Sequence, residues 1–192
     1  MTAVEPTQAE AAKPLTPEMV AEIRRLCDRY PDRRAVVLPA LHVVHHRWRM
    51  VPRSAVVEIA ELLGLAPAEV QDTLSFYGFF KQDRPHGVVR AWVCRSISCA
   101  LRGGDGLLER LCELAGTRPG EPARDGALTV EAAECLGACE HAPCVLANET
   151  LYRSVDPEEA VELFRKLRQQ AALEERSEAA SQEAPAGKSH EE

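Results

Sequence analysis

Four cysteines of this 192-residue chain stand in two close pairs, and they are the strongest chemical signal in the sequence. Cys94 and Cys99 have four residues between them, and Cys135 and Cys139 have three. Two such pairs, separated by a helix-sized stretch, can supply the four thiolates of a [2Fe–2S] cluster. The spacing therefore predicts a metal–thiolate site that favours an iron–sulfur cluster, and hence electron transfer.

Other interpretations of the four cysteines stay open. A structural zinc site also takes four thiolates, although zinc-binding cysteines are most often separated by two residues. That interpretation gives an interaction module without redox chemistry. Buried cysteines can also simply fill a core. A disulfide enzyme of the thioredoxin type needs two cysteines separated by two residues, and the sequence contains no such pair.

Composition narrows the class of protein. The net charge of −7 argues against a nucleic-acid-binding protein. Residues 1–13 lack the basic and apolar regions of a secretory signal, and the cysteine count of seven is odd. We therefore expect a reducing cytosol rather than a disulfide framework. The sequence has no apolar run approaching the roughly 18–20 residues of a membrane span, so direct membrane insertion is not expected.

The first half of the chain has the pattern of a small helical bundle. Thr16-Pro17 is typical of a helix start, with threonine as the N-cap and proline in the first turn, and apolar residues follow at helical spacing as far as Tyr30. Gly64 is a helix stop. We expect further helices over 35–50 and 53–63 and from Pro67, with Pro39 either delaying or kinking the second.

The second half has the pattern of an α/β sandwich. The expected order is a strand ending at Cys94, a helix opening at Gly103-Gly104, a strand over 127–133, a hairpin around residues 148–150, and a helix from Asp156. Both cysteine pairs follow a strand, so both can lie at one end of the same sheet. This places a helical N-terminal domain before a small α/β domain.

Several neighbouring residues are candidates to support the site. Gly137 lies between the second pair of ligands and permits unusual backbone angles. Ser96 and Ser98 offer hydroxyl donors to sulfur. Cys144 follows the second pair by five residues, and a supporting or packing role is favoured over direct ligation.

Other chemically able residues have simpler interpretations. Cys27 and Cys112 fall in amphipathic helices and are expected in cores. His42, His45 and His46 share a helix, where a polar margin is a stronger interpretation than a metal site. With Arg47 and Arg49, the last two histidines form a basic patch, which is either solvated or a partner contact.

Several segments together resemble a known family. In sequence order these are Tyr30-Pro31, Leu38-Pro39-Ala40-Leu41-His42, Ala60-Glu61-Leu62-Leu63-Gly64, Phe76-Tyr77, the Cys94 and Cys99 pair, and Glu134-Cys135-Leu136-Gly137-Ala138-Cys139 followed by Ala142-Pro143. They resemble the E-type chains of bacterial NADH–quinone oxidoreductase, which are the small [2Fe–2S] subunits of the NADH-oxidising arm of complex I. NAD-linked hydrogenases and formate dehydrogenases contain the same module.

The resemblance implies an α+β fold, a helical N-terminal segment followed by a thioredoxin-like [2Fe–2S] domain. It implies that Cys94, Cys99, Cys135 and Cys139 are the cluster ligands. It also implies a partner flavoprotein that carries FMN and binds NADH, so that this chain carries electrons without catalysing a reaction itself. The implied location is cytoplasmic, on the inner face of the membrane through the complex.

We expect four segments from these patterns. They are a disordered arm over 1–15, the helical domain over 16–85, the cluster domain over 86–170 and an acidic disordered tail over 171–192. The sequence departs from the family at 45–49, at 75–80 and at Cys144. These departures leave the oxidoreductase type and the partner open.

Overall fold

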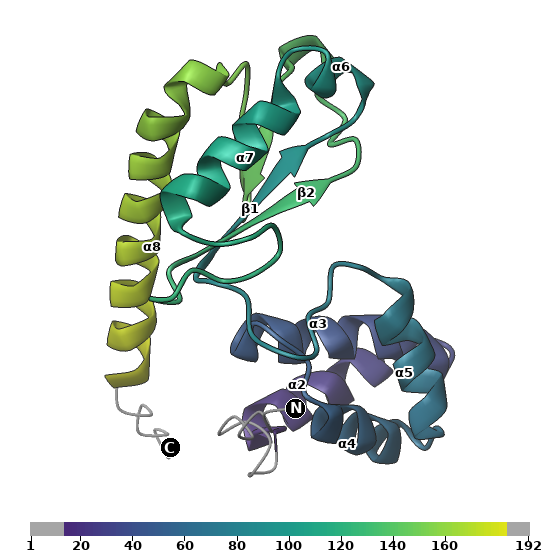
Figure 1. Cartoon of the computed structure of the whole chain (residues 1–192). Helices are drawn as coiled ribbons and strands as arrows, with labels where there is room; N and C mark the ends of the chain where they lie inside the picture. The colour runs from purple at the N-terminus through teal and green to yellow at the C-terminus, as the bar shows by residue number, and fades with distance from the viewer. Residues whose placement is uncertain (1–13, 184–192) are drawn as a thin grey trace, which may run out of the picture. The chain divides into compact units, whose positions relative to one another are not determined.

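The computed structural model describes residues 14–183, which form two compact units, one up to Pro85 and one from His86 (Figure 1). The predicted α+β class is confirmed, because helices precede a four-stranded mixed sheet that carries its own helices. Among these residues, no helix combines the length and the apolar character that crossing a bilayer requires.

The first unit is helical. Its elements are α2 (Pro17–Cys27), η1 (Arg33–Val36), α3 (Val37–Trp48), α4 (Arg53–Leu63) and α5 (Pro67–Phe76).

Local sequence signals set the ends of these helices. The Thr16 hydroxyl accepts a hydrogen bond from the Met19 N–H, as an N-cap does. Gly64 ends α4 with a φ of 69°, in the left-handed region that glycine adopts without strain. Pro39 lies in the first turn of α3, where its missing N–H costs no helical hydrogen bond, so the helix starts late and the proline does not interrupt it. The expected extension of the first helix to Tyr30 is wrong, since α2 ends at Cys27.

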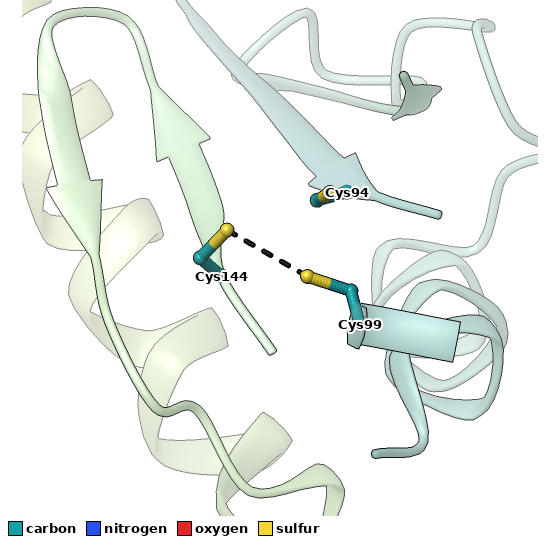
Figure 2. A group of neighbouring side chains, drawn as sticks. All are labelled: Cys94, Cys99 and Cys144. Atoms are coloured by element: carbon teal, nitrogen blue, oxygen red, sulfur yellow. Dashed lines mark hydrogen bonds between the residues drawn. The ribbon is translucent and has the colours of Figure 1, made fainter. Parts of the chain in front are cut away.

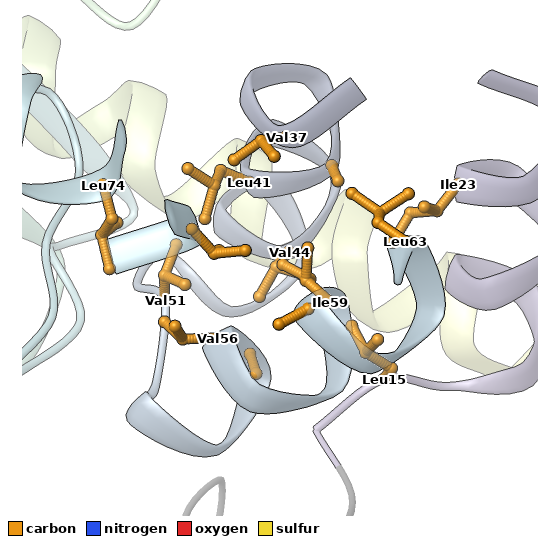
Figure 3. Packing of buried hydrophobic residues seen from close by; sticks show 14 of the residues in the cluster. Leu15, Ile23, Val37, Leu41, Val44, Val51, Val56, Ile59, Leu63 and Leu74 are labelled. Carbon is orange, nitrogen blue, oxygen red and sulfur yellow. The ribbon is translucent and has the colours of Figure 1, made fainter. Parts of the chain in front are cut away.

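Aliphatic side chains from all four α-helices form one core in this unit (Figure 3). Ile23, Leu41 and Ile59 are fully buried at its centre. Leu15 is also buried against this core, and the Trp48 Nε1–H donates to the Pro14 carbonyl at 2.9 Å. The ordered fold therefore includes the last two residues of the predicted arm, and residues 1–13 lie outside the described part.

The second unit is an α/β sandwich. Its elements are β1 (Val89–Cys94), α6 (Ile97–Ala100), α7 (Gly104–Ala115), β2 (Leu128–Ala133), η2 (Cys139–His141), β3 (Val145–Ala147), β4 (Thr150–Tyr152), η3 (Pro157–Glu159) and α8 (Ala160–Glu183). The strand order is β2-β1-β3-β4, with β1 parallel to β2 and the other neighbours antiparallel. The predicted order of strands and helices is confirmed, and α6 is an addition that the sequence did not signal.

One face of this sheet carries the core. Val89, Ala91 and Val93 alternate along β1 and pack with leucines of α7 and α8, such as Leu107 and Leu167. Figure 1 shows α7 and α8 lying together over the sheet. The connection from β1 through α7 to β2 is the crossover that a parallel pair requires.

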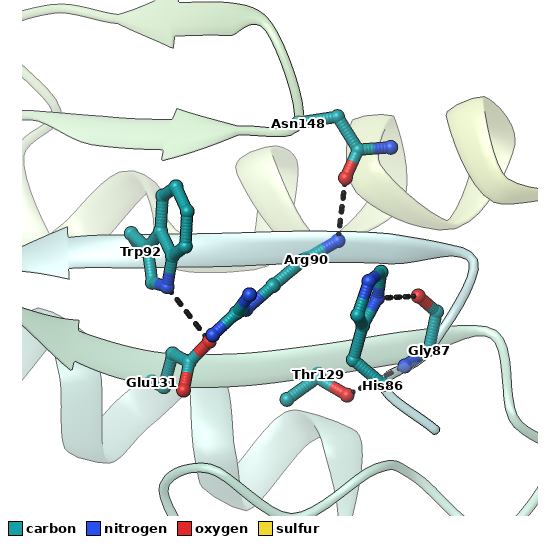
Figure 4. A network of polar contacts seen from close by, with 7 residues as sticks. All are labelled: His86, Gly87, Arg90, Trp92, Thr129, Glu131 and Asn148. Atoms are coloured by element: carbon teal, nitrogen blue, oxygen red, sulfur yellow. Dashed lines mark hydrogen bonds and ion pairs between the residues drawn. The ribbon is translucent and has the colours of Figure 1, made fainter. Parts of the chain in front are cut away.

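The alternate residues of β1 and β2 form a polar network (Figure 4). Arg90 is buried and forms an ion pair with Glu131, and the Trp92 Nε1–H donates to the same carboxylate at 2.7 Å. The Arg90 guanidinium also lies over the Trp92 ring, 4.5 Å from its centroid. Thr129 is buried too, and its hydroxyl accepts from the Gly87 N–H at 2.7 Å.

The last helix differs from the expected tail. We expected disorder from residue 171, but α8 continues to Glu183. Ala171 is buried against the sheet, and the Asn148 amide donates to the Glu174 carboxylate at 2.8 Å. These contacts hold the helix beyond residue 170. The remainder of the predicted tail, 184–192, lies outside the described residues.

Candidate metal centre

The two cysteine loops leave the sheet at the same end. Cys94 is the last residue of β1 and pairs with Ala133, the last residue of β2. Because these strands are parallel, both following loops start at their carboxyl ends. The prediction that each cysteine pair follows a strand of one sheet is confirmed.

Three thiols lie close together in the buried part of this end of the sheet (Figure 2). The sulfur atoms of Cys94, Cys99 and Cys144 all lie within 4.8 Å of one another, and each residue is at most 2% exposed. Cys94 belongs to β1, Cys99 to the one-turn helix α6, and Cys144 immediately precedes β3. Ala138 and Ala142 complete this small core.

The second pair is exposed. The sulfurs of Cys135 and Cys139 are 3.6 Å apart, and the Gly137 N–H donates to the Cys135 sulfur at 3.4 Å. Gly137 has a φ of 77°, which turns the loop so that both thiols come together. The position of Gly137 between the two cysteines therefore has a physical reason.

Hydrogen bonds connect the loop after β1 with the loop after β2. Burial opposes ionisation of Cys94, yet its pKa is lowered, because the backbone N–H groups of Leu136 and Ser96 donate to its sulfur. Leu136 belongs to the second loop and Cys94 to the end of β1, so this contact joins the two pairs. The Ser98 side chain hydrogen-bonds to Cys139 and opposes the rise of its pKa, which the neighbouring Cys135 thiol causes.

The other two buried thiols are held in the neutral form. Burial, reinforced by the Cys94 thiol, raises the pKa of Cys99. Burial and the neighbouring Cys99 raise the pKa of Cys144 to about 12. A cation would reverse this preference, because a metal-bound thiol is deprotonated outright.

Close packing fixes the backbone that carries Cys94 and Cys99. Gly104, the first residue of α7, lies directly against it. A Cβ atom at this position would be 2.9 Å from the carbonyl oxygens of both cysteines. Glycine therefore lets the helix start directly behind Cys94 and Cys99.

The thiol spacing suits metal binding. Two sulfurs bound tetrahedrally to one ion at about 2.3 Å lie about 3.8 Å apart. The Cys135 and Cys139 sulfurs are 3.6 Å apart, and those of Cys94 and Cys99 lie within 4.8 Å of each other. The donor set is all sulfur, the ligand type that Fe–S clusters take. The residues present therefore fit a [2Fe–2S] cluster.

The structure places Cys144 among the buried thiols of the site. The four predicted ligands lie in the same region, but the three-thiol group contains Cys144 in addition to Cys94 and Cys99. Ser96 and Ser98 both lie beside the site, Ser96 contributing its backbone N–H. The Leu136 donor and the Gly104 contact have no signal in the sequence, since both arise from folding.

The remaining candidates have structural roles. Cys112 is buried in the core of the second unit, and Cys27 packs on that of the first. The rings of His42 and His45 pack against Phe79 and Phe80. Among residues 14–183, the metal-ligating side chains that converge are those of the cysteine site.

Fold and site together define a class: a small α/β domain that holds paired thiolates at the end of two parallel strands. A family profile described as "Thioredoxin-like [2Fe-2S] ferredoxin" matches residues 23–168. The chain belongs to this family, and the predictions of a thioredoxin-like fold and of a [2Fe–2S] cofactor are confirmed.

The chain is also similar to named subunits of NADH-quinone oxidoreductase. The E subunit of NADH-quinone oxidoreductase from Mycobacterium tuberculosis (strain ATCC 25618 / H37Rv) is 35% identical over 162 residues, which cover 82% of this chain and 64% of the relative. The E 2 subunit of the same oxidoreductase from Rhizobium meliloti (strain 1021) is 36% identical over 138 residues, which cover 72% of this chain and 82% of the relative. The chain thus spans 64% of the length of the mycobacterial protein.

A solved structure has a similar fold. The NAD+-reducing [NiFe]-hydrogenase in its H2-reduced state aligns with a TM-score of 0.60 and 26% identity, over 70% of this chain and 23% of that chain. The match covers a small part of that larger protein.

Proposed function

We propose that this chain is an electron-carrying subunit of an NADH-oxidising quinone reductase, with one [2Fe–2S] cluster held by Cys94, Cys99, Cys135 and Cys139. One observation carries the proposal: the buried pair, Cys94 and Cys99, and the exposed pair, Cys135 and Cys139, lie at the same end of the sheet. The names of the relatives support the assignment to NADH–quinone oxidoreductase.

The chain's own residues have distinct parts in this function. A bound [2Fe–2S] cluster would accept and return one electron at a time. Cys94 and Cys99 hold its buried side, and the N–H groups of Leu136 and Ser96 stabilise negative charge on sulfur. Cys135 and Cys139 are exposed, so that side of the site is open to another subunit.

Catalysis belongs to a partner in this proposal. The partner is a flavoprotein subunit that carries FMN and oxidises NADH, and this chain takes no part in the hydride transfer. Ile97 and Leu101, on and beside α6, are 78% and 84% exposed next to the ligand Cys99. They offer an apolar contact for that subunit. The complex would place the chain in the cytoplasm, on the inner face of the membrane.

The cluster can be tested on the anaerobically purified chain. We expect about two irons and two sulfides per chain and an EPR signal after reduction. Cys135→Ala should abolish the bound iron and sulfide and the EPR signal. Cys112→Ala, which removes a buried thiol from the main core of the same unit, should preserve them. About one zinc per chain without iron would instead support the interaction module.

The similarity to the NAD+-reducing hydrogenase favours a second candidate function. In that case this chain is the electron-carrying module of an NAD-linked hydrogenase. Affinity purification of the tagged chain from its native host distinguishes the two. A flavoprotein that co-purifies with NADH–quinone reductase activity supports the first proposal, and one with hydrogen-dependent NAD+ reduction supports the second. NADH should reduce the cluster only when the flavoprotein is present.

A further inference from the structure

Cys144 is a fifth thiol at a site that needs four. Its sulfur lies 3.8 Å from that of Cys99, and it is 1% exposed (Figure 2). Cys112, also a buried cysteine of this unit, packs in the main core instead. The position of Cys144 therefore differs from that of a cysteine that only fills space.

The sheet register places Cys144 opposite Cys94. Val93 pairs with Val145 in the antiparallel pair, and the Cys94 N–H donates to the Cys144 carbonyl at 3.1 Å. Opposed residues of an antiparallel pair point to the same face. The two thiols thus project together from neighbouring backbone segments, while Cys99 approaches from α6.

The Cys144 sulfur lies within reach of an ion that Cys94 and Cys99 would bind. Two thiolates on one tetrahedral ion are about 3.8 Å apart. The Cys144 sulfur is 3.8 Å from that of Cys99 and within 4.8 Å of that of Cys94, so it can pair with Cys94 in place of Cys99. The three thiols also come from separate segments of the chain, namely the end of β1, α6 and the residue before β3, so removal of one leaves the other two in place.

We propose that Cys144 is a substitute iron ligand, which takes the place of Cys99 beside Cys94 when the Cys99 sulfur is missing or displaced. This inference rests on the proposed [2Fe–2S] function. The exchange is not a redox step: the Cys144 thiol loses its proton and bonds to iron, while the Cys99–iron bond breaks and a Cys99 thiolate takes up a proton. The exposed pair has no such substitute among the described residues, so the site is protected on its buried side only.

Iron and sulfide content with EPR tests the proposal on four variants of the full chain. Cys99→Ala should keep at least half of the wild-type iron, with a shifted EPR signal, because a ligand has been exchanged. Cys144→Ala should match the wild type. Cys99→Ala/Cys144→Ala should lose the cluster, whereas the matched control Cys99→Ala/Cys112→Ala should retain it.

Two results would overturn the proposal: a folded Cys99→Ala chain without iron, or loss of the cluster from Cys144→Ala alone, which would make Cys144 an ordinary ligand. A wild-type chain without iron would instead refute the proposed function.

Cobalt binding provides a second measurement if Cys99→Ala does not fold. Cys99→Ser nearly preserves the size of the side chain, and together with Cys135→Ala and Cys139→Ala it leaves Cys94 and Cys144 as the thiols of the site. This variant should bind one Co²⁺ through two thiolates, and adding Cys144→Ala should lower the sulfur-to-cobalt absorption by about half. Equal absorption with and without Cys144 would show that Cys144 does not bind and would overturn the proposal.

Discussion

Gly104→Ala is a direct test of the packing behind Cys94 and Cys99. The new Cβ atom would lie 2.9 Å from the carbonyl oxygens of Cys94 and Cys99. These are backbone atoms, so a side-chain rotation cannot relieve the contact. Either α7 moves away from the site, or the backbone of the two cysteines shifts.

The expected difference in stability is estimated from a cost in Gly104→Ala and a gain in a control variant. Overpacking at a close contact costs about 1–3 kcal/mol. Gly106→Ala is the matched control, since it lies in the same helix and a Cβ there meets no atom within 4 Å. That variant should gain about 0.5–1 kcal/mol from helix propensity. The free energies of unfolding of the two variants should therefore differ by about 1.5–4 kcal/mol.

Anaerobic urea unfolding of both variants in a Trp48→Phe background, followed by the fluorescence of the remaining Trp92, measures this difference. Iron retention during chelator treatment gives a second readout, and Gly104→Ala should lose iron faster because Cys94 and Cys99 are displaced. Equal stability and equal iron retention in the two alanine variants would refute the reasoning.

Three further predictions concern other parts of the chain. Glu131→Gln should lower the free energy of unfolding by about 3–5 kcal/mol, because it leaves the buried Arg90 charge without its carboxylate. Adding Arg90→Met should recover part of this loss, which a double-mutant cycle measures. The cluster-free chain should lose stability as pH rises from 9 toward 12, because the unfolded chain ionises Cys144 while the folded chain, with its pKa raised to about 12, retains the proton. Urea midpoints should fall less over this range in Cys144→Ala. Thr16→Ala should destabilise the first unit by about 1 kcal/mol through loss of the N-cap, with circular dichroism as the measurement and unchanged iron content as the control.

Local signals predicted much of the fold. Thr16, Gly64 and the short apolar run before Cys94 each act within a few residues, so the helix start, the helix end and the strand that they predict are found in the structure. The helix α6 escaped prediction because four residues are too few to show periodicity. The length of α8 also escaped, since the contact between Asn148 and Glu174 depends on the folded hairpin.

The site shows the same division. Spacing alone identified two cysteine pairs, because it is a property of neighbouring residues. The place of Cys144 depends on the register between β1 and β3, and the Leu136 contact depends on the meeting of two loops. Both are contacts between distant parts of the chain, which a single sequence does not display.

The parallel register of β1 and β2 has a consequence for the order of assembly. Cys94 pairs with Ala133, so the two cysteine loops meet only after α7 has crossed over and both strands have aligned. Such long-range pairing forms slowly, because the loop entropy is lost before the contacts are gained. A slip of one residue would move every side chain of β2 to the other face. Cluster uptake should therefore follow strand pairing during folding, and its rate reports when the correct alignment has formed.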